Sequence, residues 1–90
     1  MYKIVILPYA RQNILEVVNY IAQDNLFYAN KVQEYIKKSI LLLSDFPYIG
    51  KELDLIYRQI VESKYKFKIV YKLENEIIYI VAVYREQEKW

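Results

Sequence analysis

Apolar and polar residues follow the most regular pattern in the last third of the chain. Residues 65–73 read Tyr-Lys-Phe-Lys-Ile-Val-Tyr-Lys-Leu, so apolar and polar side chains nearly alternate, which is the period of a strand with one buried face. Residues 77–84 are apolar at both odd-numbered and even-numbered positions, as expected for a central strand with both faces covered. The shorter and more polar run 57–62 suits an edge strand. The pattern predicts three consecutive strands.

The connection Glu74-Asn75-Glu76 leaves the register of the last two strands open, because a slip of one residue inverts every side chain. A three-residue loop would pair Leu73 with Ile77. It would place these residues on one face: Lys66, Lys68, Ala82 and Tyr84. A two-residue loop would instead bring these residues to that face: Val81, Val83 and Arg85. No Asn-Gly or Asp-Gly decides between the loops, and we take the three-residue loop as the expectation.

The period changes to that of a helix in the first half of the chain. Residues 2–7 are a β-rich run that ends at Pro8 and predicts a first strand. In residues 9–24 and 26–44, apolar side chains recur every three or four positions, which predicts two amphipathic helices joined as a hairpin. Pro47 and Gly50 then end the second helix. Residues 51–56 are expected to be a linker.

This order of elements predicts an α+β fold with two layers. A helical hairpin has one apolar stripe to bury and a sheet has one face to offer. We therefore expect the hairpin 9–44 to pack on one face of an antiparallel sheet. Its strands are expected near residues 2–7, 57–62, 65–73 and 77–85. Ninety residues support one core, so residues 1–90 are expected to form one domain.

Composition narrows the chemistry that this chain can perform. There is no Cys and no His, so disulfides, zinc sites and histidine-based catalysis are not expected. The absence of Cys suits a protein of the reducing cytosol, which is the expected location. One Gly excludes a glycine-rich phosphate loop, and we expect no cofactor and no metal. The apolar run at the N-terminus is too short to cross a membrane, so no membrane partner is expected. The net charge of +2 neither requires nor excludes a nucleic acid partner.

Candidate site residues are the basic and aromatic side chains near the predicted meander. Cutting RNA by attack of the 2′-OH requires a base, an acid and cations that stabilise the phosphorane. The cations could be Arg58, Lys66, Lys68 and Arg85. Tyr84 or Glu86 could relay the proton, and Tyr84 or Trp90 could stack on bases. Alternatively, the lysines are solvated charges and Arg58 protects a strand edge from aggregation. Tyr71 and Tyr79 are assigned to the core.

Several short motifs, taken in order, carry a resemblance to a known family. They are Pro8-Tyr9-Ala10, Asp24-Asn25, Phe46-Pro47-Tyr48-Ile49-Gly50, Tyr57-Arg58, the strand 65–71 and Val81-Ala82-Val83 before Arg85. Over essentially the whole chain this order resembles the RelE/ParE superfamily of toxins from type II toxin–antitoxin systems. The resemblance implies a cytoplasmic, growth-inhibiting toxin, associated with plasmid stabilization and neutralised by a cognate antitoxin. Operator DNA would be bound only through the antitoxin complex.

The branches of this superfamily differ in their targets. RelE-like members resemble ribosome-dependent endoribonucleases that cut mRNA, whereas ParE-like members poison DNA gyrase. The resemblance matches Arg58, Lys68 and Arg85 to basic positions of the family. The segment 86–88, Glu-Gln-Glu, stands where nucleolytic members tend to carry His or Tyr and further basic residues. We therefore expect the ParE-like branch, with the mRNA endoribonuclease and a degenerate member that only binds antitoxin as alternatives.

Two surfaces are expected to bind partners. The target would contact a basic C-terminal surface made of Arg58, Lys66, Lys68, Arg85, Lys89 and Trp90. The antitoxin would cover apolar side chains that lie off the main helix stripes. These side chains are Phe27, Tyr28, Leu41 and Leu42.

Overall fold

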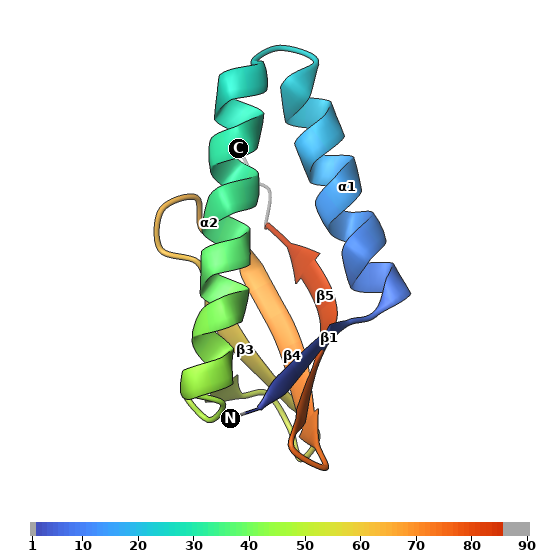
Figure 1. Ribbon diagram of the computed structural model, residues 1–90, viewed down its shortest axis with the longest axis vertical. Helices are drawn as coiled ribbons and strands as arrows, with labels where there is room; N and C mark the ends of the chain where they lie inside the picture. The colour runs from blue at the N-terminus through green and yellow to red at the C-terminus, as the bar shows by residue number, and fades with distance from the viewer. Residues whose placement is uncertain (1, 86–90) are drawn as a thin grey trace.

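The computed structural model describes residues 2–85. In chain order its elements are β1 (Lys3–Ile6), α1 (Pro8–Ala22), α2 (Leu26–Asp45), β2 (Lys51–Glu52), β3 (Tyr57–Val61), β4 (Lys68–Glu74) and β5 (Ile77–Tyr84). The strands form one sheet in the order β1-β5-β4-β3-β2. Both helices cover the same face of this sheet (Figure 1). The predicted α+β fold and the helical hairpin are confirmed.

The hairpin begins and turns where its local sequence allows. Helix α1 has Pro8 in its first turn, where the missing N–H would have had no helical partner. Helix α2 is capped by Asn25, whose Oδ1 accepts the amide of Tyr28 at 2.9 Å. The buried residues of α2 are those of its predicted stripe, Ala29, Val32, Ile36, Ile40 and Leu43.

The hydrophobic core lies between the hairpin and one face of the sheet. Its sheet residues are Phe67, Ile69, Tyr71, Ile78, Ile80 and Val83. The predicted inward face of residues 67–71 is therefore confirmed. Tyr79 was expected in the core, but it pairs with Lys72 on the opposite face, which we call the open face. The Lys72 ammonium lies 5.4 Å from the centroid of the Tyr79 ring.

The sheet is mixed, whereas an antiparallel sheet was expected. Strands β3, β4 and β5 form the predicted antiparallel meander, but β1 pairs with β5 in parallel, with Val5 opposite Tyr79. Strand β5 is interior, yet no helix within residues 2–85 covers its open face. The run 57–62 was expected at an edge, but part of the expected linker, β2, pairs with β3 and becomes the edge strand.

The loop between β4 and β5 has two residues, so the three-residue loop is wrong. Asn75 and Glu76 both have positive φ, 52° and 61°, as a type I′ turn requires, because its twist matches that of the flanking strands. A register shift follows, in which Val70 pairs with Ala82 and Tyr71 with Ile80. Val81 is therefore an extra residue in β5, and it moves every side chain after it to the opposite face of the sheet. Ala82 and Tyr84 therefore share the open face with Lys68, as the three-residue loop had predicted.

Strand β4 starts at Lys68 rather than at residue 65. Tyr65 and Lys66 lie in a turn, and Lys66 has a φ of 67°. The buried carboxylate of Glu62 organises this turn by accepting the amides of Lys64 and Tyr65. These local hydrogen bonds offer the backbone an alternative to strand pairing, so the alternating pattern overestimates the strand by three residues.

Candidate functional site

The predicted site residues do not form one cluster. Lys68 and Tyr84 lie on the open face, where the Lys68 ammonium is 5.8 Å from the centroid of the Tyr84 ring. The Tyr84 hydroxyl is 3.3 Å from Oε1 of Gln59, to which it donates. Lys66 is exposed in its turn, away from the paired strands. The alternation of side chains along β4 and β5 places Lys68 and Tyr84 on the open face, whereas Lys66 precedes β4.

Arg85 lies on the helix side of the sheet. Its guanidinium carbon is 4.8 Å from the centroid of the Phe67 ring, beside a small cavity of about 270 Å³ that α1 also lines. The other predicted site residues, Glu86, Lys89 and Trp90, lie outside the described residues. The basic surface predicted from the sequence is thus divided between two faces of the sheet.

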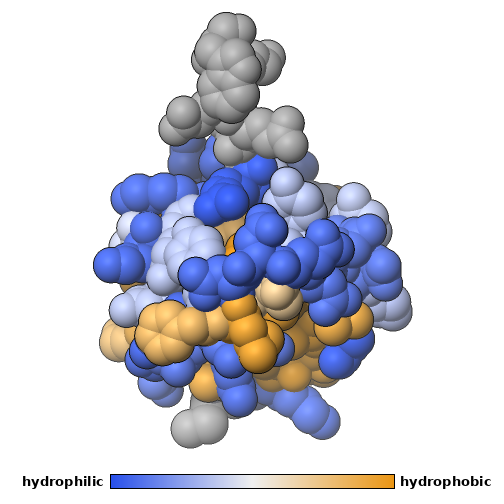
Figure 2. Space-filling view, turned by 90° about the horizontal axis from the view of Figure 1, so that it is seen from above, coloured by the Kyte–Doolittle hydropathy of each residue, from blue (hydrophilic) through white to orange (hydrophobic). Residues whose placement is uncertain are grey.

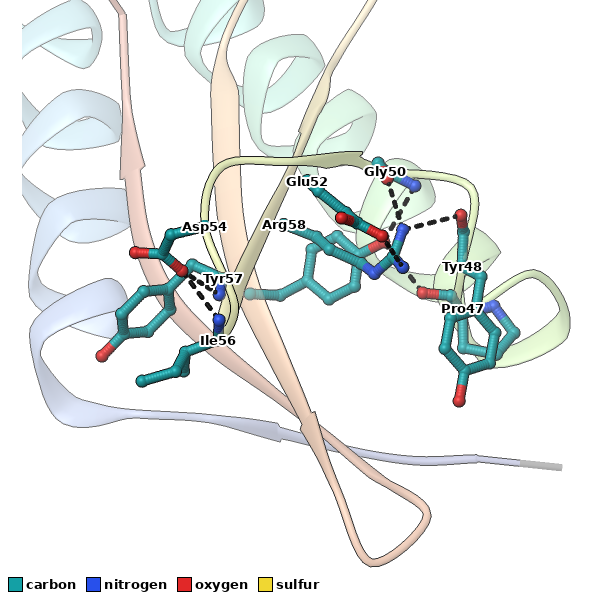
Figure 3. Close-up of polar contacts among 9 residues, drawn as sticks. Pro47, Tyr48, Gly50, Glu52, Asp54, Ile56, Tyr57 and Arg58 are labelled. Carbon is teal, nitrogen blue, oxygen red and sulfur yellow. Dashed lines mark hydrogen bonds and ion pairs between the residues drawn. The ribbon is translucent and has the colours of Figure 1, made fainter.

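Arg58 holds a loop in place instead of facing solvent. It lies on the helix side of β3, opposite Tyr71, and its side chain is 21% exposed. Its Nη1 donates to the carbonyls of Tyr48 (3.2 Å) and Gly50 (2.8 Å), and Nη2 bonds Oε1 of Glu52 at 3.0 Å (Figure 3). The Tyr48 ring stacks 5.1 Å from the guanidinium.

Tyr71 fixes the same loop from within the core. Its hydroxyl accepts the amide of Gly50 at 2.9 Å and donates to the carbonyl of Pro47 at 2.8 Å. Burial raises the pKa of Tyr71, so the hydroxyl stays protonated and keeps its donor function. The only glycine of the chain is needed here because a Cβ at position 50 would lie 2.5 Å from the Tyr71 hydroxyl oxygen.

We expect Arg58→Ala to lower the free energy of unfolding by about 2 kcal/mol, because it leaves two loop carbonyls without their charged donor. The ion pair with Glu52 adds little, since the Glu52 side chain is 70% exposed. Urea denaturation measures the loss, and Arg58→Lys is the control that keeps the charge without the planar fork. A change below about 0.5 kcal/mol, as for ordinary surface substitutions, would contradict this role.

A second turn extends the ordered loop to residue 57. Oδ1 of Asp54 accepts the amides of Ile56 and Tyr57, each at 2.8 Å. These hydrogen bonds, first that of Tyr57 and then that of Ile56, lower the pKa of Asp54. The amide of Leu53 also bonds the carbonyl of Tyr57 at 2.9 Å. The backbone is therefore held in place although residues 51–56 are exposed.

This loop, residues 46–56, presents an apolar surface to solvent. Leu55 is fully exposed at 104% and Tyr48 is 62% exposed. The other exposed apolar side chains are Phe46, Ile49, Leu53 and Ile56. We call these six side chains the loop surface. Residues 51–56 were expected to be a linker, although the three apolar residues around Asp54 were a usable signal of this surface.

The second candidate surface is a groove of about 460 Å³ between β1, α1 and α2. Its lining is Ile4, Ile6, Arg11, Ile14, Leu15, Gln33, Ile36, Lys37, Ile40 and Leu41. The lining includes two cations and no acid. Figure 2, viewed from the α1–α2 corner, shows apolar side chains gathered on the helix side of the molecule.

The apolar side chains predicted to lie off the helix stripes are exposed. Their exposed fractions are 71% for Phe27, 37% for Tyr28, 54% for Leu41 and 44% for Leu42, so this expectation is confirmed. Only Leu41 of the four lines the groove.

The sheet edge beside the groove also offers backbone groups. In the parallel pairing of β1 with β5, Lys3 and Leu7 donate to β5, so the N–H and C=O groups of Ile4 and Ile6 point to the outer side. No other strand within residues 2–85 pairs there. Ser44 closes the edge at Tyr2, whose carbonyl accepts the Ser44 hydroxyl at 2.8 Å.

Two kinds of feature are missing from the part of the chain that the structure describes. No group of three or more acidic, Cys or His side chains is arranged to hold a metal ion. Neither described helix combines the length and apolarity needed to span a membrane.

One comparison with known proteins identifies the family, and two others show the fold. Residues 4–90 match the model of the ParE toxin of the type II toxin–antitoxin system parDE. The fold is similar to a structure of the chromosomal ParDE system from P. aeruginosa, with a TM-score of 0.84 and 13% identity over 97% of this chain and 98% of that one.

A second similar structure belongs to the intact RelBE toxin–antitoxin complex of E. coli. Its TM-score is 0.72, with 14% identity over 98% of this chain and all of the other. No curated protein matches the sequence significantly. Because the family model spans nearly the whole chain, this protein belongs to the ParE toxin family of type II toxin–antitoxin systems.

Proposed function

We propose that this toxin inhibits growth by binding and poisoning DNA gyrase, and that a cognate antitoxin neutralises it. The observation that carries the proposal is the separation of the basic residues that a ribonuclease would need to gather at one phosphate. Arg58 is committed to loop carbonyls, and Arg85 lies on the helix side over Phe67. A binding toxin does not require these charges to converge.

The alternative is a RelE-like, ribosome-dependent mRNA endoribonuclease. It is favoured by one contact, that between Lys68 and Tyr84 on the open face, which puts a cation next to a phenol. Against it, the Tyr84 hydroxyl is directed to Gln59, and the chain has no His that could exchange a proton near neutral pH. The open face of the described residues therefore offers two lysine–phenol contacts, this one and that of Lys72 with Tyr79, but neither Arg58 nor Arg85, which lie on the helix side.

The groove and the edge of β1 suit an antitoxin segment. An extended peptide can add a strand to Ile4 and Ile6 through main-chain hydrogen bonds, and its apolar side chains can fill the groove. Such a segment would order as it binds, with burial of apolar surface offsetting the loss of conformational entropy. Because the charged lining residues are Arg11 and Lys37, the antitoxin segment should carry acidic side chains at this rim.

The test of the proposed function is a gyrase supercoiling and DNA-cleavage assay with the purified toxin. We expect inhibition with accumulation of cleaved DNA, and no cleavage of a defined mRNA in a translating extract. Arg85→Gln should slow association up to about tenfold at low salt and less at high salt, because rim charges act mainly on the encounter rate. Lys38→Gln, on the exposed face of α2, is the matched control. Cleavage of mRNA that is lost in Tyr84→Phe would replace this proposal with the endoribonuclease.

A further inference from the structure

The loop surface concentrates apolar side chains to an unusual degree. Among the described residues, sixteen large hydrophobic side chains are exposed, and six of them fall within residues 46–56. Solvated single apolar residues are common on proteins, whereas a concentration of them on one short segment indicates an interaction site. Loops fixed on a rigid scaffold are also where binding residues are most often found.

The loop surface is pre-organised for binding. The core hydroxyl of Tyr71 and the guanidinium of Arg58 fix residues 47–52. Asp54 fixes residues 54–57. Little conformational entropy remains to be lost when such a loop docks, which raises the affinity that each buried side chain can provide. Together these hydrogen bonds hold the loop in one conformation, so it is not a mobile linker.

Its shape and charge indicate what it fits. Leu55 projects completely into solvent, so a partner can bury this side chain only by enclosing it in an apolar pocket. Lys51 is exposed beside it, and it has no ion pair with another described residue. An acidic residue at the rim of the partner's pocket would therefore complement the loop.

Other occupants fit less well. The antitoxin segment described above needs a groove and a free strand edge, whereas β2 has two residues, both charged, which is a common protection against strand addition. A second copy of this chain would have to place Leu55 in the groove of its neighbour. That contact is heterologous, so it would generate rings or open filaments rather than a two-fold symmetric dimer.

We infer that the loop surface is the part of the toxin that inserts into an apolar pocket of its target enzyme, and that Arg58 is a positioning residue that acts through this loop. The inference rests on the proposed function and deepens it, because it moves the main contact from the dispersed basic residues to residues 48–56. The basic residues then tune the encounter, while Leu55 and its neighbours supply affinity.

The test compares Leu55→Asn with Leu26→Asn, which removes the same side chain at the first residue of α2, a position that is 66% exposed. The α1–α2 corner lies at the end of the molecule opposite the connection between α2 and β3 (Figure 1). Growth arrest, gyrase inhibition and affinity for the cognate antitoxin are measured for both. We expect Leu55→Asn to weaken gyrase inhibition by roughly thirtyfold, the size of a hot-spot truncation, and to relieve growth arrest. Antitoxin affinity and melting temperature should stay unchanged, and Leu26→Asn should behave as the parent protein.

The role of Arg58 is read from a double-mutant cycle. If Arg58 acts through the loop, Arg58→Lys should reduce gyrase inhibition in the parent protein but have no further effect in Leu55→Asn. A general loss of stability would instead add to the effect of Leu55→Asn. Additive effects would overturn the positioning role.

Three results would overturn the inference. They are unchanged toxicity of Leu55→Asn, parallel loss of toxicity and antitoxin affinity, and self-association in sedimentation that Leu55→Asn abolishes. If the parent protein does not inhibit gyrase, the proposed function fails. The growth-arrest comparison still decides whether the loop surface is required, because it does not depend on the identity of the target.

Discussion

Gly50→Ala is expected to lower the free energy of unfolding by about 2–3 kcal/mol, a large effect for one methyl group in a loop. The added Cβ would lie 2.5 Å from the hydroxyl oxygen of Tyr71 and 2.7 Å from its Cε1. Tyr71 is fully buried, so its ring cannot move away without disturbing the core. The hydrogen bonds from Gly50 to Tyr71 and from Tyr71 to Pro47 would be strained by the same movement.

The usual effect of a Gly→Ala substitution on the free energy of unfolding has the opposite sign. Where the native backbone accepts alanine, Gly→Ala stabilises by about 0.4–1 kcal/mol through the unfolded state, and Gly50 does not have a positive φ. Urea denaturation separates the two outcomes. Tyr71→Phe is the second variant of this test. Alone it should lower the free energy of unfolding by about 1–3 kcal/mol, because it leaves the Gly50 amide unpaired. Combined with Gly50→Ala it should cost less than the sum, because part of the clash disappears. A stable Gly50→Ala variant would show that the loop is not fixed as described.

Leu41→Glu is expected to abolish neutralisation by the antitoxin while leaving the toxin active. Leu41 lines the groove and is 54% exposed, so the folded toxin tolerates a carboxylate there. In the complex the same carboxylate would be buried against apolar side chains of the antitoxin, and an ion pair with Lys37, one helical turn earlier in the groove lining, would only partly offset the loss of its hydration. A penalty of about 2–4 kcal/mol corresponds to an affinity loss of roughly thirtyfold to a thousandfold.

The adjacent residue provides a matched control for this prediction. Leu42 is 44% exposed and does not line the groove, so Leu42→Glu should remain neutralised. Growth with co-expressed antitoxin and isothermal titration calorimetry measure the two variants. If both were neutralised equally well, the groove would not be the antitoxin site. If both lost toxicity without antitoxin, the substitutions would have damaged the fold.

Much of the fold follows from patterns that are local in the sequence. The stripe from Ala29 to Leu43 predicts the buried face of α2, because a helix repeats every 3.6 residues whatever it packs against. Asn25 predicts the start of that helix, since its side chain caps the neighbouring amide. The alternation at residues 67–71 likewise predicts which side of β4 enters the core.

The candidate site was less predictable, because the roles of its residues depend on partners distant in sequence. Arg58 was expected to be a surface cation, because its hydrogen bonds to the carbonyls of Tyr48 and Gly50 exist only once the loop has folded back over β3. The side of the sheet on which Arg85 lies depends on Val81, an extra residue in β5 that shifts the alternation of the side chains after it. No local sequence motif predicts this extra residue. The loop surface was missed because a linker with apolar residues becomes a surface only when Tyr71 and Asp54 hold its backbone.

The order of the elements, the apolar stripes of the hairpin and the inward face of the meander could all be predicted without the structure. Periodicity and capping act within a few residues, so they can be recognised along the chain. The parallel pairing of β1 with β5 and the position of Arg58 over the loop depend on contacts between segments far apart in the chain, which no short stretch contains. The two-residue turn at Asn75 and Glu76 is local, but its register was settled by how β4 and β5 pack their side chains into the core, because competing registers place opposite faces inside.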